Sequence, residues 1–174
     1  QLMGIPLVAL YGHKITSLPT SVTIGIMDVA DTIAEATDFF QQGFRILKVK
    51  TGMQVDEDIE RVLKLHERFG RQVRLRIDAN QGYDPASLHT FLSATQHLNL
   101  ELIEQPLPVG QENALLAFDP EIRKILVADE SLKSADSARK LAIAPQPFGI
   151  FNIKLMKCGG IAGAMHIADI AKQT

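Results

Sequence analysis

Short apolar runs typical of strands alternate with longer amphipathic stretches of helical period from about residue 21 to the end of the chain. This alternation predicts an α/β fold in which a parallel sheet is wrapped by helices. The expected strands are Ser21–Met27, Arg45–Lys50, Val73–Ala79, Leu100–Glu104, Ile125–Asp129 and Phe148–Leu155.

The helical stretches carry the residues expected at helix ends. Asp28 can cap the first stretch, and Asp84 followed by Pro85 begins the third. Gly43 and Gly70 follow the first and second stretches, where glycine can end a helix without steric cost. The pattern predicts six βα units without a linker, preceded by a connecting segment at residues 1–20.

Two fold classes fit six βα units, a (β/α) barrel of the TIM type and a doubly wound sheet. The alternation alone leaves both open, so the placement of charged residues has to distinguish them. A barrel brings the carboxyl ends of its strands together around one mouth.

Three acidic residues, Asp78, Glu104 and Asp129, stand at the ends of successive expected strands, about one βα unit apart. One such Asp most often caps the following helix, but three at one period favour a shared site in a barrel mouth. Three like charges repel one another unless a cation holds them together. Oxygen ligands of this kind favour Mg²⁺, with Mn²⁺ as the alternative.

Three lysines belong to the same rim of the expected barrel. Lys48 and Lys50 are two residues apart on one strand and point to the same side, and Lys154 ends the sixth strand. Such lysines can form surface ion pairs. Crowded by other cations and a metal ion in a pocket shielded from water, they would instead have a lowered pKa and act as bases, one on each face of a substrate.

The order of these residues resembles the muconate-lactonizing subgroup of the enolase superfamily over residues 20–174. Segments 21–26 and 152–161 look most like those of dipeptide epimerases, including the L-Ala-D/L-Glu type. The residues that carry the resemblance are Lys48, Lys50, Asp78, Glu104, Asp129 and Lys154.

The resemblance implies a role for each residue. Asp78, Glu104 and Asp129 would bind Mg²⁺, and Lys50 and Lys154 would be the acid/base pair. Lys48 and Thr23 would contact the substrate. Neighbouring polar residues would orient the carboxylates by hydrogen bonds; these are Asn80, Gln105 and Glu130.

The resemblance also implies the reaction, which is Mg²⁺-dependent epimerisation of a dipeptide through an enolate formed next to a carboxylate. A muconate-type cycloisomerase and an o-succinylbenzoate synthase-like dehydratase share the same residues and remain alternatives. A non-catalytic metal-binding barrel is the third. Members of this family have an N-terminal capping domain and two further βα units, which are absent from the 174 residues, so residues 21–174 would be a partial barrel.

Composition narrows the partners. The net charge is −2 and basic residues are scattered, so neither nucleic acid nor a membrane surface is an expected partner. A single cysteine, Cys158, excludes an internal disulfide, and no apolar run could span a bilayer, so we expect a cytoplasmic protein. The first residue is Gln1, which leads us to expect a longer parent protein, homo-oligomeric in its full-length form.

Overall fold

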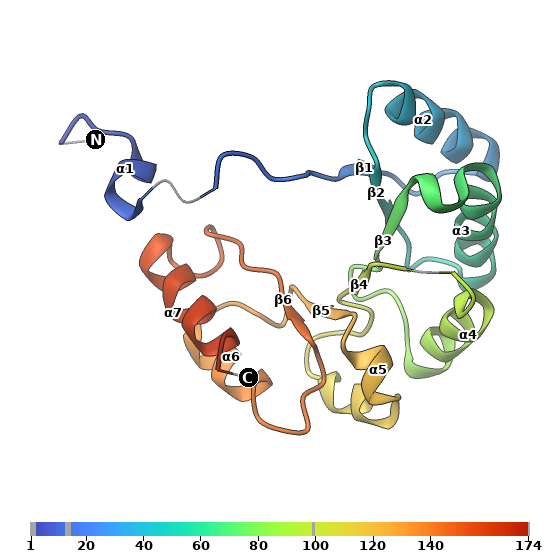
Figure 1. Ribbon diagram of the computed structural model, residues 1–174. Coiled ribbons are helices and arrows are strands. Elements are labelled where there is room, and N and C mark those ends of the chain that lie inside the picture. Colours follow the sequence, from blue (N-terminus) through green and yellow to red (C-terminus); the bar gives the residue numbers. More distant parts are fainter. Residues whose placement is uncertain (1–2, 13–14, 99, 174) are drawn as a thin grey trace.

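A computed structural model describes residues 3–12, 15–98 and 100–173. Its six strands are all parallel and neighbour one another in sequence order (Figure 1). A doubly wound sheet would reverse its strand order at a switch point, so the sequential order confirms the barrel-type α/β fold. The strands are β1 (Val22–Ile24), β2 (Ile46–Lys50), β3 (Arg74–Asp78), β4 (Leu102–Glu104), β5 (Leu126–Ala128) and β6 (Ile150–Phe151).

Helices cover the outer side of this curved sheet, and the N-terminal helix projects away from it (Figure 1). Within the described ranges, no helix combines the length and the apolar character that crossing a membrane requires. The helices are α1 (Leu7–Tyr11), α2 (Val29–Gln41), α3 (Val55–Phe69), α4 (Pro85–Thr95), α5 (Pro120–Arg123), α6 (Ala135–Leu141) and α7 (Ile161–Ala171), with 3-10 turns η1 (Gly70–Gln72) and η2 (Glu112–Ala117).

The expected helix ends are confirmed. The Asp28 carboxylate accepts a hydrogen bond from the amide of Asp31 at 2.8 Å, and the Asp84 carboxylate accepts one from Ser87 at 2.7 Å. Each satisfies an amide that the first turn leaves without an intrahelical partner. Two glycines, at positions 43 and 70, have positive φ angles just after α2 and α3, as required where a chain leaves a helix in the left-handed region.

The hydrophobic core lies between the sheet and its helices. On β2, Leu47 and Val49 are fully buried in this core, whereas Lys48 and Lys50 are partly exposed on the opposite side of the strand. Side chains alternate between the two faces of a strand, so packing of the apolar pair against the helices forces both lysines onto the inner face of the barrel.

All six strands are shorter than expected, and the two outer ones differ most. Ser21–Met27 was too long for β1, which spans Val22–Ile24, and Phe148–Leu155 was too long for β6, which spans Ile150–Phe151. Both strands lie at sheet edges in the described structure and have a hydrogen-bonding neighbour on one side only. Lys154 therefore lies after β6, just before a turn, instead of ending the strand.

The connecting segment expected at residues 1–20 is described except at positions 1–2 and 13–14, which lie outside the described residues. It contains α1, which the sequence pattern did not predict, and the side chains of α1 are exposed. The domain division at residue 20 stays a prediction.

Candidate functional site

Three buried carboxylates stand where neighbouring strands end. Asp78 and Glu104 are the last residues of β3 and β4 and face each other in register, and Asp129 directly follows β5. They are 1%, 4% and 2% exposed. Ionised groups are rarely buried without a compensating charge, so this grouping requires cations beside it.

Two lysines of β2 supply part of that charge. The Lys48 ammonium bridges two carboxylates, at 2.8 Å from Asp78 and 2.7 Å from Glu104. The Lys50 ammonium lies 2.7 Å from the same oxygen of Asp78 and donates a 2.5 Å hydrogen bond to the side-chain oxygen of Asn80. The structure thus brings Lys48 and Lys50 to the predicted carboxylates.

Lysines from the segment after β6 complete the group. The Lys154 ammonium contacts the Asp129 carboxylate at 2.5 Å and lies 3.6 Å from Glu104. Lys157 also contacts the Asp129 carboxylate and donates to its backbone carbonyl. We call the three carboxylates and four lysines the carboxylate–lysine cluster.

The charges in this cluster stabilise one another. Burial raises the pKa of Asp78, but hydrogen bonds from Lys48 and Lys50 outweigh it and leave the pKa below its ordinary value. Burial likewise raises the pKa of Asp129, and its two lysine partners lower it further than burial raises it. Both carboxylates are therefore ionised at neutral pH.

The expected lowering of the lysine pKa depends on a bound metal ion and stays a prediction; with the carboxylates alone as neighbours, the pKa of two lysines is raised. Burial lowers the pKa of Lys48, but contacts with Asp78 and Glu104 leave it above its ordinary value. Burial also lowers the pKa of Lys154, and the hydrogen bond and charge of Asp129 reverse the direction. For Lys48 and Lys154, the nearby carboxylates outweigh burial because each ammonium lies within hydrogen-bond distance of at least one of them.

Gln105 joins the ends of β4 and β5. Its fully buried side-chain oxygen accepts from the amides of Asp129 at 2.9 Å and Ser131 at 3.1 Å, and its nitrogen donates to the Ser131 hydroxyl. The hydrogen bonds from these two amides fix the backbone that carries the Asp129 carboxylate. Gln105 has a φ of +36°, a conformation that non-glycine residues rarely adopt.

Asn80 links the ends of β3 and β5 on the exposed side of the cluster. Its oxygen accepts from Lys50, and its nitrogen donates to the Glu130 carboxylate at 3.1 Å. Asn80 also has a positive φ, of +43°. The structure places Asn80, Gln105 and Glu130 beside the cluster, and their orienting roles stay predictions.

Two further polar residues at the site were missed by the sequence analysis. Asn152 donates a 2.8 Å hydrogen bond to the Glu104 carboxylate, and Lys157 holds Asp129 as described above. The signal for Asn152 was its position two residues before Lys154 in an extended segment, which places both on one side. Lys157 lies in a turn, where no period predicts its direction. Thr23, on β1, lies in register with Lys48 of β2, and its side chain is exposed.

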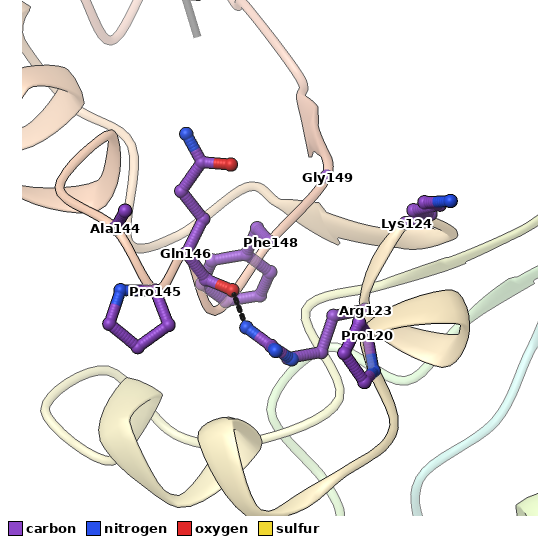
Figure 2. A pocket seen from close by; sticks show the side chains of 8 residues that line it. All are labelled: Pro120, Arg123, Lys124, Ala144, Pro145, Gln146, Phe148 and Gly149. Atoms are coloured by element: carbon purple, nitrogen blue, oxygen red, sulfur yellow. Dashed lines mark hydrogen bonds between the residues drawn. The ribbon is translucent and has the colours of Figure 1, made fainter.

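Two further pockets lie outside the carboxylate–lysine cluster. One of about 290 Å³ lies at the opposite ends of the strands, between α5 and residues 144–149, where Arg123 donates to the Gln146 carbonyl (Figure 2). Another of about 450 Å³ lies beside the loops that follow β1 and β2. Charged side chains also line the second pocket, but the buried carboxylates paired with lysines lie in the carboxylate–lysine cluster.

The donor set suits a hard divalent cation in its chemistry. Among the described residues, no three acidic, His or Cys side chains are drawn together as around a metal ion; ammonium groups lie between the carboxylates. Lys48 contacts two of the three carboxylates at once, so a positive charge is accommodated between adjacent strand ends. Carboxylate oxygens are the ligands Mg²⁺ prefers.

A parallel barrel-type sheet with acids at three successive strand ends and lysines on both sides is distinctive. The matching family model is described as enolase C-terminal domain-like and covers residues 31–174. The chain belongs to this family. The predicted enolase-superfamily relationship is thereby confirmed.

Enolase C-terminal domain-like relatives include several epimerases. The chain is 50% identical to the L-Lys-D/L-Arg epimerase of Desulforapulum autotrophicum, over 97% of this chain and 48% of that protein. It is 33% identical to the L-Ala-D/L-Glu epimerase of Bacillus subtilis, over 99% of this chain and 48% of that protein. The chain thus spans about half the length of the curated relatives it matches.

A solved relative has the same fold. The dipeptide epimerase of Methylococcus capsulatus, crystallised with Mg²⁺ and the dipeptide L-Arg-D-Lys, superposes with a TM-score of 0.92 at 46% identity. The match covers 99% of this chain and 49% of that one. That relative holds both a metal ion and a dipeptide.

Proposed function

We propose that the protein containing this chain is a Mg²⁺-dependent dipeptide epimerase, which inverts the α-carbon next to a carboxylate. The observation that carries the proposal is the placement of Lys50 and Lys154 at opposite sides of one group of buried carboxylates. Epimerisation requires one group to remove a proton from one face and another to return a proton to the other face.

Lys50 and Lys154 are assigned to the two faces. In the described arrangement the pKa of Lys154 is raised, so its ammonium group is in the form that donates a proton. Lys48 lies beside Glu104, and Thr23 lies in register with it on the neighbouring strand β1; we assign both to contact with the substrate carboxylate. The lysine roles are supported by contacts within one cluster, Lys50 with Asp78, Lys48 with Asp78 and Glu104, and Lys154 with Glu104 and Asp129.

Asp78, Glu104 and Asp129 are the residues that would hold Mg²⁺, and Asn80, Gln105 and Glu130 would orient them. Mn²⁺ has similar preferences and would be the substitute. A bound divalent ion would neutralise the carboxylates, lower the pKa of the neighbouring lysines and acidify the α-proton of a carboxylate substrate.

The substrate class is narrowed by the relatives. The sequence resemblance included the L-Ala-D/L-Glu type, whereas relatives at 50% and 47% identity are L-Lys-D/L-Arg epimerases. The L-Ala-D/L-Glu epimerases in the comparison reach 33%. We therefore propose dipeptides with cationic side chains as substrates ahead of L-Ala-L-Glu. We also propose that the whole protein is a homo-oligomer and that its barrel includes residues 21–174.

The test follows α-deuterium incorporation by NMR when the full-length protein is incubated with Mg²⁺ in D₂O. Both L,L and L,D forms of Lys-Arg, Arg-Lys and Ala-Glu would be supplied. We expect exchange with inversion. Lys50→Ala and Lys154→Ala should each abolish inversion, and each should spare exchange with retention in the one stereoisomer that the remaining lysine serves.

A matched control is Lys124→Ala, which removes a lysine paired with Glu121 at the far end of the sheet. This variant should epimerise like the wild type. Absence of exchange on all the dipeptides would contradict the proposal. Turnover of a muconate-type or dehydratase substrate instead would identify the related reactions, and Mg²⁺ binding without any proton exchange would identify a non-catalytic barrel.

A further inference from the structure

A buried charged network lies directly behind the strand that carries Lys50. Asp58 and Arg61 of α3 and Tyr83 of the β3–α4 loop are 1%, 2% and 3% exposed. One Asp58 oxygen accepts from the Arg61 guanidinium at 2.5 Å, and the other accepts from the Tyr83 hydroxyl at 2.9 Å. We call these three residues the Asp58 network.

The Asp58 network makes hydrogen bonds to the backbone on both sides of Thr51. The same nitrogen of Arg61 that contacts Asp58 also donates to the carbonyl of Lys50 at 3.0 Å. The amide of Gly52 donates to the Asp58 carboxylate at 2.8 Å. The peptide groups that join β2 to its following loop are therefore held from within the core, immediately after Lys50.

The loop after β2 packs closely, backbone to backbone, against the loop after β3. A Cβ atom on Gly52 would lie 2.2 Å from the Ala79 carbonyl oxygen, and one on Gly82 would lie 2.0 Å from the Gly52 oxygen. Gly82 is followed by Tyr83, and Ala79 follows Asp78. The network thus fixes the end of β2 against the end of β3, where the Lys50 ammonium contacts Asp78 and Asn80.

Stability alone is a weak explanation for such a network. A buried ion pair often contributes little, because desolvation offsets the attraction between its charges. Within the described part of the chain, one guanidinium nitrogen of Arg61, Nη1, has no hydrogen-bond partner, which makes the burial more costly. Burial raises the pKa of Tyr83, and the Asp58 charge raises it further, so the phenol remains a donor.

We infer that Asp58, Arg61 and Tyr83 are positioning residues that set where the Lys50 ammonium lies relative to the substrate α-carbon. This inference rests on the proposed epimerase function and names residues that act only on its Lys50 face. Lys154 belongs to a different segment. Among the described residues, its ion pairs are with Asp129 and Glu104 and none joins it directly to the Asp58 network. Loosening the network therefore slows proton transfer on one face and spares the other.

Isotope exchange can separate the two faces. Lys50→Ala first identifies the stereoisomer that Lys50 serves, since that isomer loses exchange while the other keeps exchange with retention. Asp58→Asn keeps the side-chain volume and removes the charge, and Tyr83→Phe removes one hydroxyl while keeping the ring against Phe91. A displacement of about 1 Å in a reacting group can cost on the order of 100-fold in rate.

The experiment measures initial exchange rates of both stereoisomers with the full-length enzyme in Mg²⁺ and D₂O. For the isomer served by Lys50 we expect a loss of roughly tenfold in Asp58→Asn and about threefold in Tyr83→Phe. Exchange of the other isomer should stay within about twofold of the wild type. The milder variant keeps the test decisive if Asp58→Asn does not fold.

Arg123→Gln is the matched control, because Arg123 also donates to two backbone carbonyls from a half-buried position but lies at the opposite end of the strands (Figure 2). Any activity it loses should be equal for both isomers. Equal losses for both isomers in the Asp58 network variants would overturn the positioning role while the wild-type exchange upholds the epimerase. Absence of exchange in the wild type would overturn both.

Discussion

Lys50 and Lys154 make the same kind of contact with buried carboxylates but are anchored in different ways. Lys50 ends an inner strand with neighbours on both sides, and its carbonyl is held by Arg61 from the core. Lys154 follows an edge strand, and its carbonyl accepts bonds from residues 157 and 158 within its own turn. One lysine is placed by the core, and the other by a local turn and its ion pair with Asp129.

Two lysines with the same kind of carboxylate contact can therefore be supported by different parts of the fold. The backbone after Lys50 packs closely against the next loop, whereas the turn after Lys154 exposes Leu155 and Met156 to solvent. Substitutions behind Lys50 should therefore affect the stability of the whole fold. Substitutions around Lys154 should have local effects, and three measurements test this contrast.

The largest effect is expected from a glycine pair. Gly52→Ala on the Lys50 side places a methyl group 2.2 Å from a backbone oxygen at a φ of +100°, and should lower the free energy of unfolding by about 3 kcal/mol. Gly159→Ala on the Lys154 side has a similar φ and no atom within 4 Å, so strain alone should cost about 1 kcal/mol. Urea unfolding measures both, and equal losses would remove the contrast.

Glu104 is the carboxylate that the two sides share, since it contacts Lys48 and lies near Lys154. Glu104→Gln should weaken Mg²⁺ binding on the order of 100-fold, because a proposed ligand loses its charge. Glu101→Gln alters a nearby carboxylate that pairs with Arg74 and Arg76 instead, and should leave the affinity unchanged. Calorimetric titration with MgCl₂ provides the comparison, and equal affinities in both variants would exclude Glu104 as a ligand.

The smallest effect concerns alkaline pH in the metal-free protein. The pKa values of Lys48 and Lys154 are raised in the folded state, so their stabilisation is complete below the ordinary value of 10.5 and is lost as pH rises through the raised pKa. Lys48 contacts two carboxylates and Lys154 is more exposed. Replacement by Met should flatten the pH dependence more at position 48, with differences within about 1 kcal/mol.

This pH contrast is measured by urea unfolding from pH 8 to about pH 11. A steeper loss of the pH dependence in Lys154→Met than in Lys48→Met would mean that the exposed turn holds the stronger ion pair. The ordering of the two sides would then be reversed.

Local signals in the sequence predicted local structure well. Asp28 and Asp84 cap their helices because the bond reaches only three residues along the chain. The carboxylates were grouped correctly because the βα period carries each strand end to the same edge of the sheet. Strand order followed from the same period once the charges favoured a barrel.

Features that depend on neighbours in space could not be predicted in this way. The limits of β6 depend on which strands pair with it, so its expected length was wrong. The direction of the Lys154 pKa depends on distances to Asp129 and Glu104 that no spacing specifies. Asp58, Arg61 and Tyr83 look like ordinary helix and loop residues in the sequence, and only the fold shows that they meet behind Lys50.

The sequential strand order also bears on how such a chain is synthesised. Each strand from β2 onward pairs with the strand that left the ribosome just before it. Closing the intervening loops therefore has a modest entropic cost, and no strand has to wait for a distant part of the chain. The barrel wall can grow one unit at a time during translation, with the carboxylates at the ends of β3, β4 and β5 assembled in the order in which they are made.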